Sequence, residues 1–268
     1  MPLAVCATPI GNLDDVTLRV LEELRAADVV LCEDTRHTRV LLDRHELSAR
    51  LLSYHEHNEA KRTAELLPRL RQGERIALVS DAGLPGISDP GARLVAAALE
   101  AGVPVTVLPG ASAVETALVA SGVAAERYQF IGFLPRAARA LAALWTELAS
   151  WPHPVVAFES PRRLPATLRS LAEAQPEREV VVCRELTKRF EEVVRGTAEE
   201  VAARFTQPPK GEITLVLGPA PDVVAGDAGA ALEAVGELVR AGLRRRRAAD
   251  VVSRLTGVSR NELYRRTL

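Results

Sequence analysis

The fold of this chain is decided by the stretch Ile76-Ala-Leu-Val-Ser-Asp-Ala-Gly-Leu-Pro-Gly-Ile-Ser-Asp-Pro-Gly91. It begins with an apolar strand pattern at 76–80, and a helical pattern follows it at 92–101. The eleven residues 81–91 contain three glycines, two prolines and two aspartates, so they form a loop of preset shape whose backbone can approach a ligand closely. A simple turn would need only one or two such residues. Asp89 suits the N-cap of the following helix and Pro90 its first position.

The same order of strand and helix continues on both sides of this stretch. In residues 1–122 short apolar strands alternate with longer helical patterns, which is typical of a largely parallel sheet with helices on both faces. The strands are predicted at 3–8, 29–32, 76–80 and 103–108, and the helices at 18–27, 38–45, 60–71, 92–101 and 113–120.

A second series of strands and helices begins near Tyr128. Its strands are predicted at 130–133, 155–158, 180–184, 192–195 and 213–217, and its helices at 137–149, 165–174 and 197–205. Some of these strands follow one another without a helix between them, so this sheet is predicted to be mixed. The apolar pattern is interrupted at 122–127, which predicts two domains, 1–122 and 123–218. The predicted fold class is α/β.

The residues beyond Gly218 have a different composition. Prolines and glycines between 219 and 229 indicate a linker, and three short helical patterns follow at 230–241, 247–255 and 261–266. Two short helices across the turn at Gly257 resemble a helix-turn-helix, a module that binds either nucleic acid or protein. We therefore predict a third, helical unit at 227–268.

The net charge of -1 conceals an uneven distribution of charge. Residues 240–268 hold nine arginines against Asp250 and Glu262, a local charge of +7, so the other 239 residues carry -8. A run of charge is usually a solvated surface, but a basic end on an acidic body is also typical of nucleic-acid binding. The balance of the whole chain alone would have argued against such a partner.

Composition excludes several classes of protein. With 47% hydrophobic residues the chain can bury a core, so general disorder is excluded. Its three cysteines, Cys6, Cys32 and Cys183, include no Cys-x-x-Cys pair, which fits a reducing compartment and provides no zinc ligand set. The chain starts on a short apolar run without a basic segment, and no apolar run reaches the roughly 18 residues of a membrane helix. We expect a cytoplasmic protein without a metal site.

Four loops follow predicted strand ends, where an open α/β sheet binds its ligand. Besides 81–91 they are 8–13, 32–36 and 108–113. The first has one glycine where a dinucleotide fingerprint needs three, so by itself it is an ordinary turn. The second, with Asp34 or Thr35 as a helix N-cap, could be a capped helix with a surface ion pair. Together, at one edge of one sheet, the four loops predict a ligand site.

The motifs in these loops resemble those of the tetrapyrrole-methylase-type S-adenosylmethionine (SAM) enzymes. The motifs are Thr8-Pro-Ile-Gly-Asn-Leu13, Glu33-Asp-Thr-Arg36, Ser80-Asp-Ala-Gly-Leu-Pro-Gly-Ile-Ser-Asp-Pro-Gly91 and Leu108-Pro-Gly-Ala-Ser-Ala113. Glu159-Ser-Pro-Arg162, Arg184-Glu-Leu-Thr-Lys188 and Gly211-Glu-Ile-Thr214 are similar to one branch, the bacterial 16S rRNA cytidine 2′-O-methyltransferases. The resemblance covers about residues 3–218, and the arginine-rich end resembles the helical appendage of that branch. Asp81-Ala-Gly83 departs from the Gly-Asp-Pro of tetrapyrrole enzymes, which favours the RNA branch.

The resemblance implies that SAM binds in a cleft between two α/β domains, in a chain that forms a homodimer and acts on 16S rRNA in the small ribosomal subunit. The implied cofactor-binding residues of the first domain are Pro9, Asp81, Gly83, Ile87, Pro109, Ser112 and Ala113. Those of the second domain are Phe133, Leu186, Gly211, Glu212 and Thr214. With an RNA substrate, the basic end is predicted to follow phosphates through Arg244, Arg245, Arg246, Arg247, Arg260 and Arg265.

The chemistry that this resemblance implies is the attack of a ribose 2′-hydroxyl on a sulfonium methyl group. A hydroxyl is a poor nucleophile at neutral pH, so the enzyme must align it and help its proton to leave. The Lys-Asp-Lys-Glu set of other ribose methyltransferases cannot be assembled from the only lysines, Lys61, Lys188 and Lys210. The candidates for these tasks are Asp34, Arg36 and Lys188.

Two other functions fit parts of the sequence. A methyltransferase that acts on a tetrapyrrole could use the same cleft, but it would have no use for the arginine-rich end. A ribosome-binding protein that has kept the fold without catalysis is the second alternative, and the intact glycine-rich loops count against it.

Overall fold

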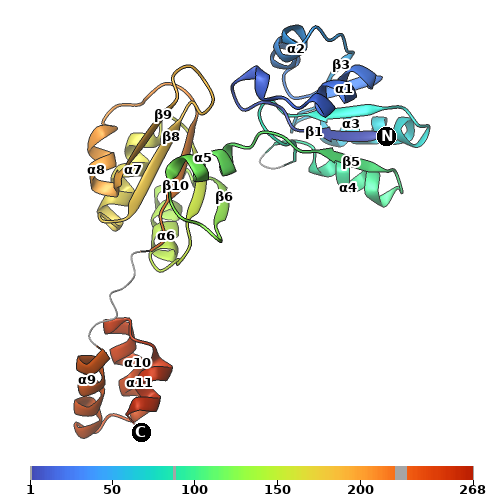
Figure 1. Ribbon diagram of the computed structural model, residues 1–268. Coiled ribbons are helices and arrows are strands. Elements are labelled where there is room, and N and C mark those ends of the chain that lie inside the picture. The colour runs from blue at the N-terminus through green and yellow to red at the C-terminus, as the bar shows by residue number, and fades with distance from the viewer. Residues whose placement is uncertain (1, 87–88, 221–227, 268) are drawn as a thin grey trace.

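The computed structural model describes residues 2–86, 89–220 and 228–267. Figure 1 shows two α/β domains, each built on one sheet, and a separate unit of three helices at the C-terminal end. The predicted fold class is therefore confirmed. The predicted SAM residue Ile87 and most of the predicted linker lie outside the described residues.

The first sheet is entirely parallel, with the strand order β3-β2-β4-β1-β5. Its strands are β1 (Leu3–Cys6), β2 (Val29–Cys32), β3 (Leu51–Ser53), β4 (Ile76–Val79) and β5 (Val105–Leu108). Side chains alternate along a strand, so successive residues of β1 enter two different cores. Leu3 and Val5 pack with α3 (Glu59–Arg71) and α4 (Ala92–Glu100), whereas Ala4 and Cys6 pack with α1 (Leu18–Ala26) and α2 (Thr35–Arg44).

The structure differs from the prediction at three elements of this domain. Strand β3 was not predicted, because three partly buried residues at a sheet edge carry little periodic signal. Helix α2 begins at Thr35, three residues earlier than predicted. Helix α4 is capped by Gly91, at φ +139°, and not by Asp89. Gly91 has no Cβ atom, which would lie 2.8 Å from Leu78 Cδ2, and it can adopt this positive φ value, so it suits the turn before α4 and Asp89 stays in the loop.

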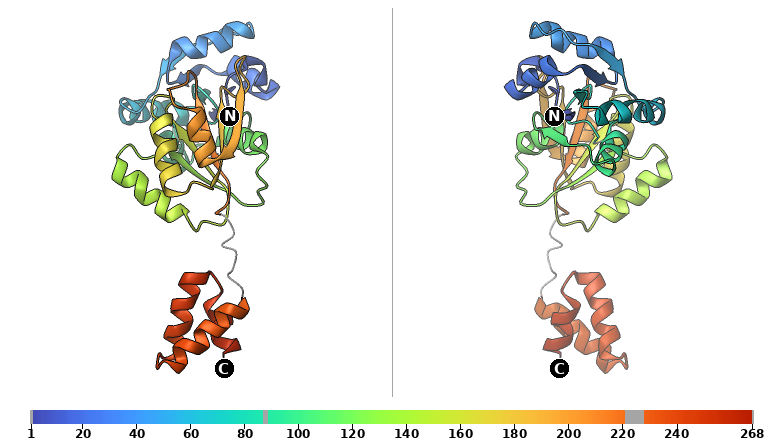
Figure 2. Two further views of the ribbon diagram at one scale, coloured as in Figure 1. Left: turned by 90° about the vertical axis from the view of Figure 1, so that its left-hand side faces the viewer. Right: turned by 90° about the vertical axis from the view of Figure 1, so that its right-hand side faces the viewer.

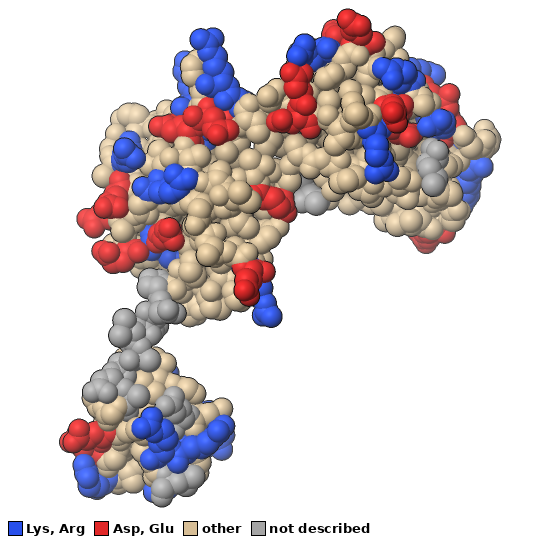
Figure 3. Space-filling model, in the orientation of Figure 1, with Lys and Arg blue, Asp and Glu red and all other residues tan. Residues whose placement is uncertain are grey.

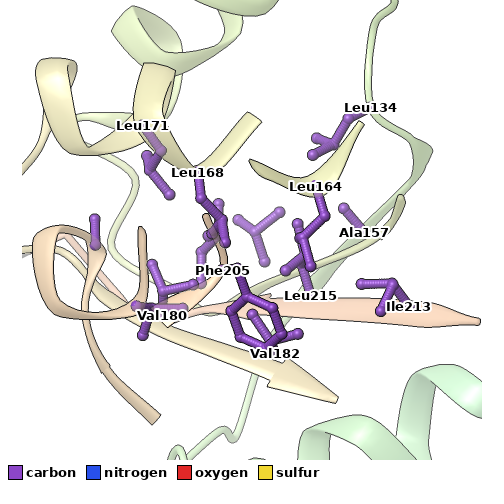
Figure 4. Packing of buried hydrophobic residues seen from close by; sticks show 14 of the residues in the cluster. Leu134, Ala157, Leu164, Leu168, Leu171, Val180, Val182, Phe205, Ile213 and Leu215 are labelled. Atoms are coloured by element: carbon purple, nitrogen blue, oxygen red, sulfur yellow. The ribbon is translucent and has the colours of Figure 1, made fainter. Parts of the chain in front are cut away.

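The second sheet is mixed, as predicted, with the order β6-β7-β10-β8-β9. Its strands are β6 (Gln129–Phe133), β7 (Val155–Glu159), β8 (Glu179–Arg184), β9 (Glu192–Thr197) and β10 (Ile213–Leu217). Only β6 and β7 pair in parallel, and β10 runs antiparallel to both of its neighbours. One face packs on α6 (Ala138–Leu148), α7 (Leu164–Ala174) and α8 (Ala198–Arg204). In Figure 4 Leu164 and Leu168 of α7 lie among Val182 and Leu215 of the sheet.

Helix α5 (Ala113–Ser121) covers the opposite face of this second sheet. Val114, Ala117 and Leu118 pack with Val181 and Val216, although the helix directly follows β5 of the first sheet. The predicted boundary near 122–127 assigned this helix to the first domain. By packing, the chain passes from one domain to the other between β5 and α5, because the apolar side of α5 finds its partners on the second sheet.

The C-terminal unit consists of α9 (Ala228–Arg240), α10 (Arg245–Thr256) and α11 (Arg260–Arg266). Val235, Val252 and Leu263 form part of its own apolar core, and Gly257 ends α10 in the left-handed conformation. The three helices lie apart from the α/β domains in both views of Figure 2. No helix of the described residues has the length and apolar character that crossing a membrane requires.

Candidate active site

The candidate site is built at the carboxyl ends of the strands of the first sheet. Thr8, after β1, and Gly83, after β4, form an isolated antiparallel bridge with N–H···O distances of 2.8 and 3.1 Å. The Thr8 hydroxyl also donates to the carbonyl of Ser80 at 3.0 Å. Hydrogen bonds therefore tie two of the predicted ligand loops together.

The loop after β2 joins this framework through Asp34. Its backbone N–H donates to Asp81 Oδ1 at 3.2 Å, and its carboxylate caps α2 by accepting from the Arg36 N–H at 2.8 Å. The Arg36 guanidinium also donates to the Asp34 carboxylate, at 2.9 Å for Nη2. These side-chain and backbone hydrogen bonds lower the pKa of Asp34 to about 2. Asp34 is thus an ionised helix cap at neutral pH.

The second domain reaches the site through residues 185–188. Glu185 and Thr187 both have positive φ values, +54° and +65°, which a β-branched threonine rarely adopts. The strained turn presents the Thr187 hydroxyl to the backbone N–H of Asn12 in the first domain, at 2.9 Å. A Cβ atom on Gly11 would lie 2.8 Å from that hydroxyl, so only glycine permits the two loops to meet.

Lys188, one of the predicted catalytic residues, is held by two carboxylates at the end of this turn. Its Nζ lies 3.0 Å from Glu185 Oε1 and 2.7 Å from Glu212 Oε2. Partial burial disfavours the charge, but the hydrogen bonds to Glu212 and Glu185 outweigh it and raise the pKa of Lys188. The side chain is therefore a fixed cation at neutral pH.

A cavity of about 500 Å³ lies between the two domains. Ile10, Leu84 and Val114 line it from the first part of the chain, and Phe158, Leu186 and Ile213 from the second sheet and its loops. Phe158 makes edge-to-face contacts with Phe130 and Phe133, at centroid distances of 5.0 and 5.5 Å. The result is a mainly apolar pocket with loop backbone along one side.

The charged groups in this cavity are all acidic. Glu33, Asp81, Asp89, Glu159 and Glu212 line it, and no Lys, Arg or His is present among its described lining residues. Burial, with the negative charges of Glu33 and Asp81, raises the pKa of Asp89 to about 6. Burial likewise raises the pKa of Glu33, together with the charge of Asp81. Such a cavity favours a ligand with positive charge.

A smaller cavity of about 90 Å³ adjoins the first. The two share Ile10, Asp81, Ala82 and Glu212 in their linings. The smaller one is also lined by His37 from the first turn of α2 and by Lys188 from the second domain. It therefore adds cationic and basic groups beside an acidic pocket.

The structure brings most of the predicted cofactor residues together. Those that line the larger cavity are Asp81, Gly83, Ser112, Ala113, Phe133, Leu186, Glu212 and Thr214. Pro9 and Lys188 line the smaller cavity. Pro109, Gly211, Asp34 and Arg36 flank these loops without lining either cavity.

The predicted RNA-binding residues all lie on the C-terminal unit. Arg244, Arg246, Arg247, Arg260 and Arg265 are exposed, and Arg245 is partly buried. Arg260 Nη1 also pairs with Asp250 at 3.2 Å. Figure 3 shows Lys and Arg side chains spread over the visible face of this unit.

Several lining residues were not predicted from the sequence. Phe158 and Glu159 end β7, and Ser160 and Pro161 follow it, so the rule that ligands bind at strand ends could have identified them. His37 gave no such signal, since it lies inside a helix. Among the residues that the structure describes, no cluster of His, Cys, Asp or Glu side chains is arranged to hold a metal ion.

Solved structures with a similar fold include methyltransferases. Uroporphyrin-III-C-methyltransferase from Thermus thermophilus matches 81% of this chain and 93% of its own, with a TM-score of 0.56 and 24% identity. The alignment with the methyltransferase CobJ covers 81% of this chain and 94% of CobJ, with a TM-score of 0.61 and 20% identity. The family model for tetrapyrrole (corrin/porphyrin) methylases matches residues 2–202. The chain therefore belongs to the tetrapyrrole methylase family.

Its sequence relatives narrow the class further. It is 45% identical to "Ribosomal RNA small subunit methyltransferase I" of Micromonospora olivasterospora, over 98% of this chain and 85% of the relative. The protein of that name from Mesorhizobium japonicum is 43% identical, over 99% of this chain and 91% of the relative. The one from Thermotoga maritima is 44% identical over 216 residues, which are 80% of this chain and 97% of that shorter relative. The chain is a methyltransferase.

Proposed function

We propose that this chain transfers the methyl group of SAM to the 2′-hydroxyl of a cytidine ribose in the decoding region of 16S rRNA, within the small ribosomal subunit. The observation that carries the proposal is the pair of adjoining cavities: the charged groups lining the larger one are all acidic, whereas the smaller one has Lys188 and His37 beside Asp81 and Glu212. The names of the relatives at 43–45% identity support an RNA substrate.

The larger cavity suits SAM in shape and charge. Phe133, Phe158 and Ile213 offer an apolar surface for an adenine ring, and the N-terminal end of α5 at Ser112–Val114 offers backbone N–H groups for a carboxylate. Asp81 and Asp89 favour the positive sulfonium and amino groups. Bound there, SAM supplies an electrophilic methyl group.

The same acidic cavity repels phosphate, so RNA must approach from its rim. In our proposal Lys188, which lines the smaller cavity, and Arg36, the residue before His37, hold the ribose-phosphate backbone, because nearby carboxylates keep both cations in place. Asp34 acts indirectly, by fixing the first turn of α2. The reacting ribose then enters the smaller cavity beside the bound cofactor.

The C-terminal unit supplies affinity for the subunit in this proposal. Its exposed arginines contact phosphates without reading sequence, while the α/β domains select the nucleotide. The proposal includes a homodimer as the active form and a cytoplasmic location, where small subunits are found. A tetrapyrrole substrate is the alternative, because structures with this fold include tetrapyrrole methyltransferases.

The proposal is tested with radiolabelled SAM and small subunits from cells that lack this methyltransferase. We expect label in 16S rRNA, and 2′-O-methylcytidine as the product in nucleoside mass spectrometry. A methylated base, or label transferred only to uroporphyrinogen III in a parallel reaction, would refute the RNA ribose assignment.

A matched pair of variants tests the cofactor site in the same assay. Phe133 and Phe190 are 63% and 65% exposed, but only Phe133 lines the larger cavity. We expect Phe133→Ala to weaken SAM binding about tenfold in calorimetry, since base stacking on an aromatic ring contributes about 1–3 kcal/mol. Phe190→Ala should leave SAM affinity unchanged, and an equal loss in both variants would contradict the placement of the cofactor.

A further inference from the structure

The smaller cavity contains groups that differ in their ability to accept a proton. Lys188 is held as a cation by Glu185 and Glu212, which raise its pKa, so it has no free electron pair at neutral pH. Asp34, whose pKa is lowered to about 2, is a weak base and has its carboxylate directed at Arg36 and the helix end. Neither of these predicted catalytic residues is suited to remove the proton of a hydroxyl.

His37 is placed differently from both. It lies in the first turn of α2, its side chain is 56% exposed, and it lines the smaller cavity, so a substrate can reach its ring. An imidazole is the side chain whose proton exchange normally falls near neutral pH, which is why it is the commonest general base.

Asp81 gives the His37 ring an orientation. Its Oδ2 lies 3.8 Å from His37 Nδ1, while its Oδ1 accepts the N–H of Asp34 at 3.2 Å. The Asp81 carboxylate thus links the N-terminal end of α2 to the His37 ring, and it also lines both cavities. A contact of 3.8 Å is longer than a hydrogen bond, but such contacts commonly tighten when the substrate binds.

We propose that His37 is the general base of the methyl transfer and that Asp81 is its positioning residue. The proposal rests on the proposed 2′-O-methylation. The 2′-hydroxyl gives its proton to His37 Nε2 as its oxygen forms a bond to the methyl carbon. The carbon–sulfur bond breaks and its electron pair stays on sulfur, which becomes neutral. His37 then returns the proton to solvent, to which its side chain is open.

The charges around His37 define how the reaction should depend on pH. Asp81 and Asp34 are the anions on its own side, and Arg36 is the neighbouring cation. Lys188 and Glu212 also line this cavity, and Lys188 Nζ lies 2.7 Å from Glu212 Oε2. Because a general base acts only in its unprotonated form, the rate should rise with pH and then level off.

The test compares wild type, His37→Gln and His37→Ala in single turnover with saturating SAM and small subunits, from pH 5.5 to 9. We expect His37→Gln to lower the rate about 10²–10⁴-fold and to abolish the acid limb of the profile. Added imidazole should restore part of the rate of His37→Ala. His57→Gln is the matched control, because His57 is an exposed histidine of the first domain that lines neither cavity, and it should behave as wild type.

The outcomes separate this proposal from the function on which it rests. If wild type forms 2′-O-methylcytidine and His37→Gln keeps its rate and its acid limb, His37 is not the base although the function stands. If His37→Gln loses subunit binding in proportion to its rate, the residue binds RNA and the proposal is likewise refuted. If wild type forms no 2′-O-methylcytidine, both proposals fall. Unchanged SAM affinity in calorimetry is expected for every variant.

Discussion

Asp89 shows how a single residue that lines the larger cavity can reduce stability. It lies in the loop before α4, where burial and the carboxylates of Glu33 and Asp81 raise its pKa to about 6. The folded protein therefore binds the proton of Asp89 more tightly than the unfolded chain does. The stability that this proton provides is present at low pH and is lost as the pH rises towards and through about 6. At neutral pH the ionised side chain destabilises the free protein but attracts a cationic ligand.

Asp89→Asn should therefore stabilise the free protein at pH 7.5. Because Asp89 is partly solvated, we expect a gain of only about 1 kcal/mol, or about 2–4 °C in the thermal midpoint. The gain should shrink as the pH is lowered from 7.5 to 5, and SAM affinity at pH 7.5 should fall. Asp43→Asn, at an exposed position of α2, is the control. A midpoint difference independent of pH would contradict the role of this carboxylate.

At the scale of the element, α2 lines the smaller cavity through His37, Thr38 and Leu41, and Asp34 caps its first turn. Asp34→Ala removes the N-cap, so we expect the free energy of unfolding to fall by about 1 kcal/mol and the methylation rate to fall several-fold as His37 loses its position. Asp34→Ser keeps a capping oxygen, so it should recover the free energy of unfolding, measured with denaturant, and the methylation rate. A serine variant as slow as the alanine variant would mean that the carboxylate itself takes part in the reaction.

At the scale of the whole molecule, the acidic α/β domains and the basic helical unit have separate cores. The Thermotoga maritima relative aligns over 216 residues, close to the combined length of the two α/β domains here. Deletion of residues 227–268 should leave SAM affinity intact and weaken subunit binding. The slope of log affinity against log salt should become shallower by roughly 0.7–0.9 for each phosphate that the shortened chain no longer binds.

Point variants distinguish the charge of this unit from its bulk. A triple alanine variant in the C-terminal unit should reproduce much of the change in salt dependence, whereas one on exposed sites of the first domain should not. The variant in the C-terminal unit replaces Arg244, Arg246 and Arg247. The variant in the first domain replaces Arg19, Arg25 and Arg71. Equal effects of the two sets, measured by filter binding at several salt concentrations, would refute a specific role for the unit.

Local sequence was sufficient for most of the fold. Strands β2 and β10 lie where their apolar runs predict, and α8 lies within the helix predicted at 197–205, because both patterns depend on neighbouring residues. The position of α5 was not predictable in this way. Its apolar residues show that it is buried but not on which sheet, since that depends on residues about 40 to 100 positions further along the chain.

The candidate site, like the fold, depends partly on adjacent residues and partly on the tertiary structure. The sequence by itself determined the α/β class, the loops at the strand ends and the basic end, because turn chemistry, periodicity and charge are properties of adjacent residues. Only the tertiary structure decided that Asp89 lies among carboxylates and that His37 meets Asp81. Proton affinity depends on burial and on charges within a few ångströms, and these neighbours come from strands that are distant in sequence.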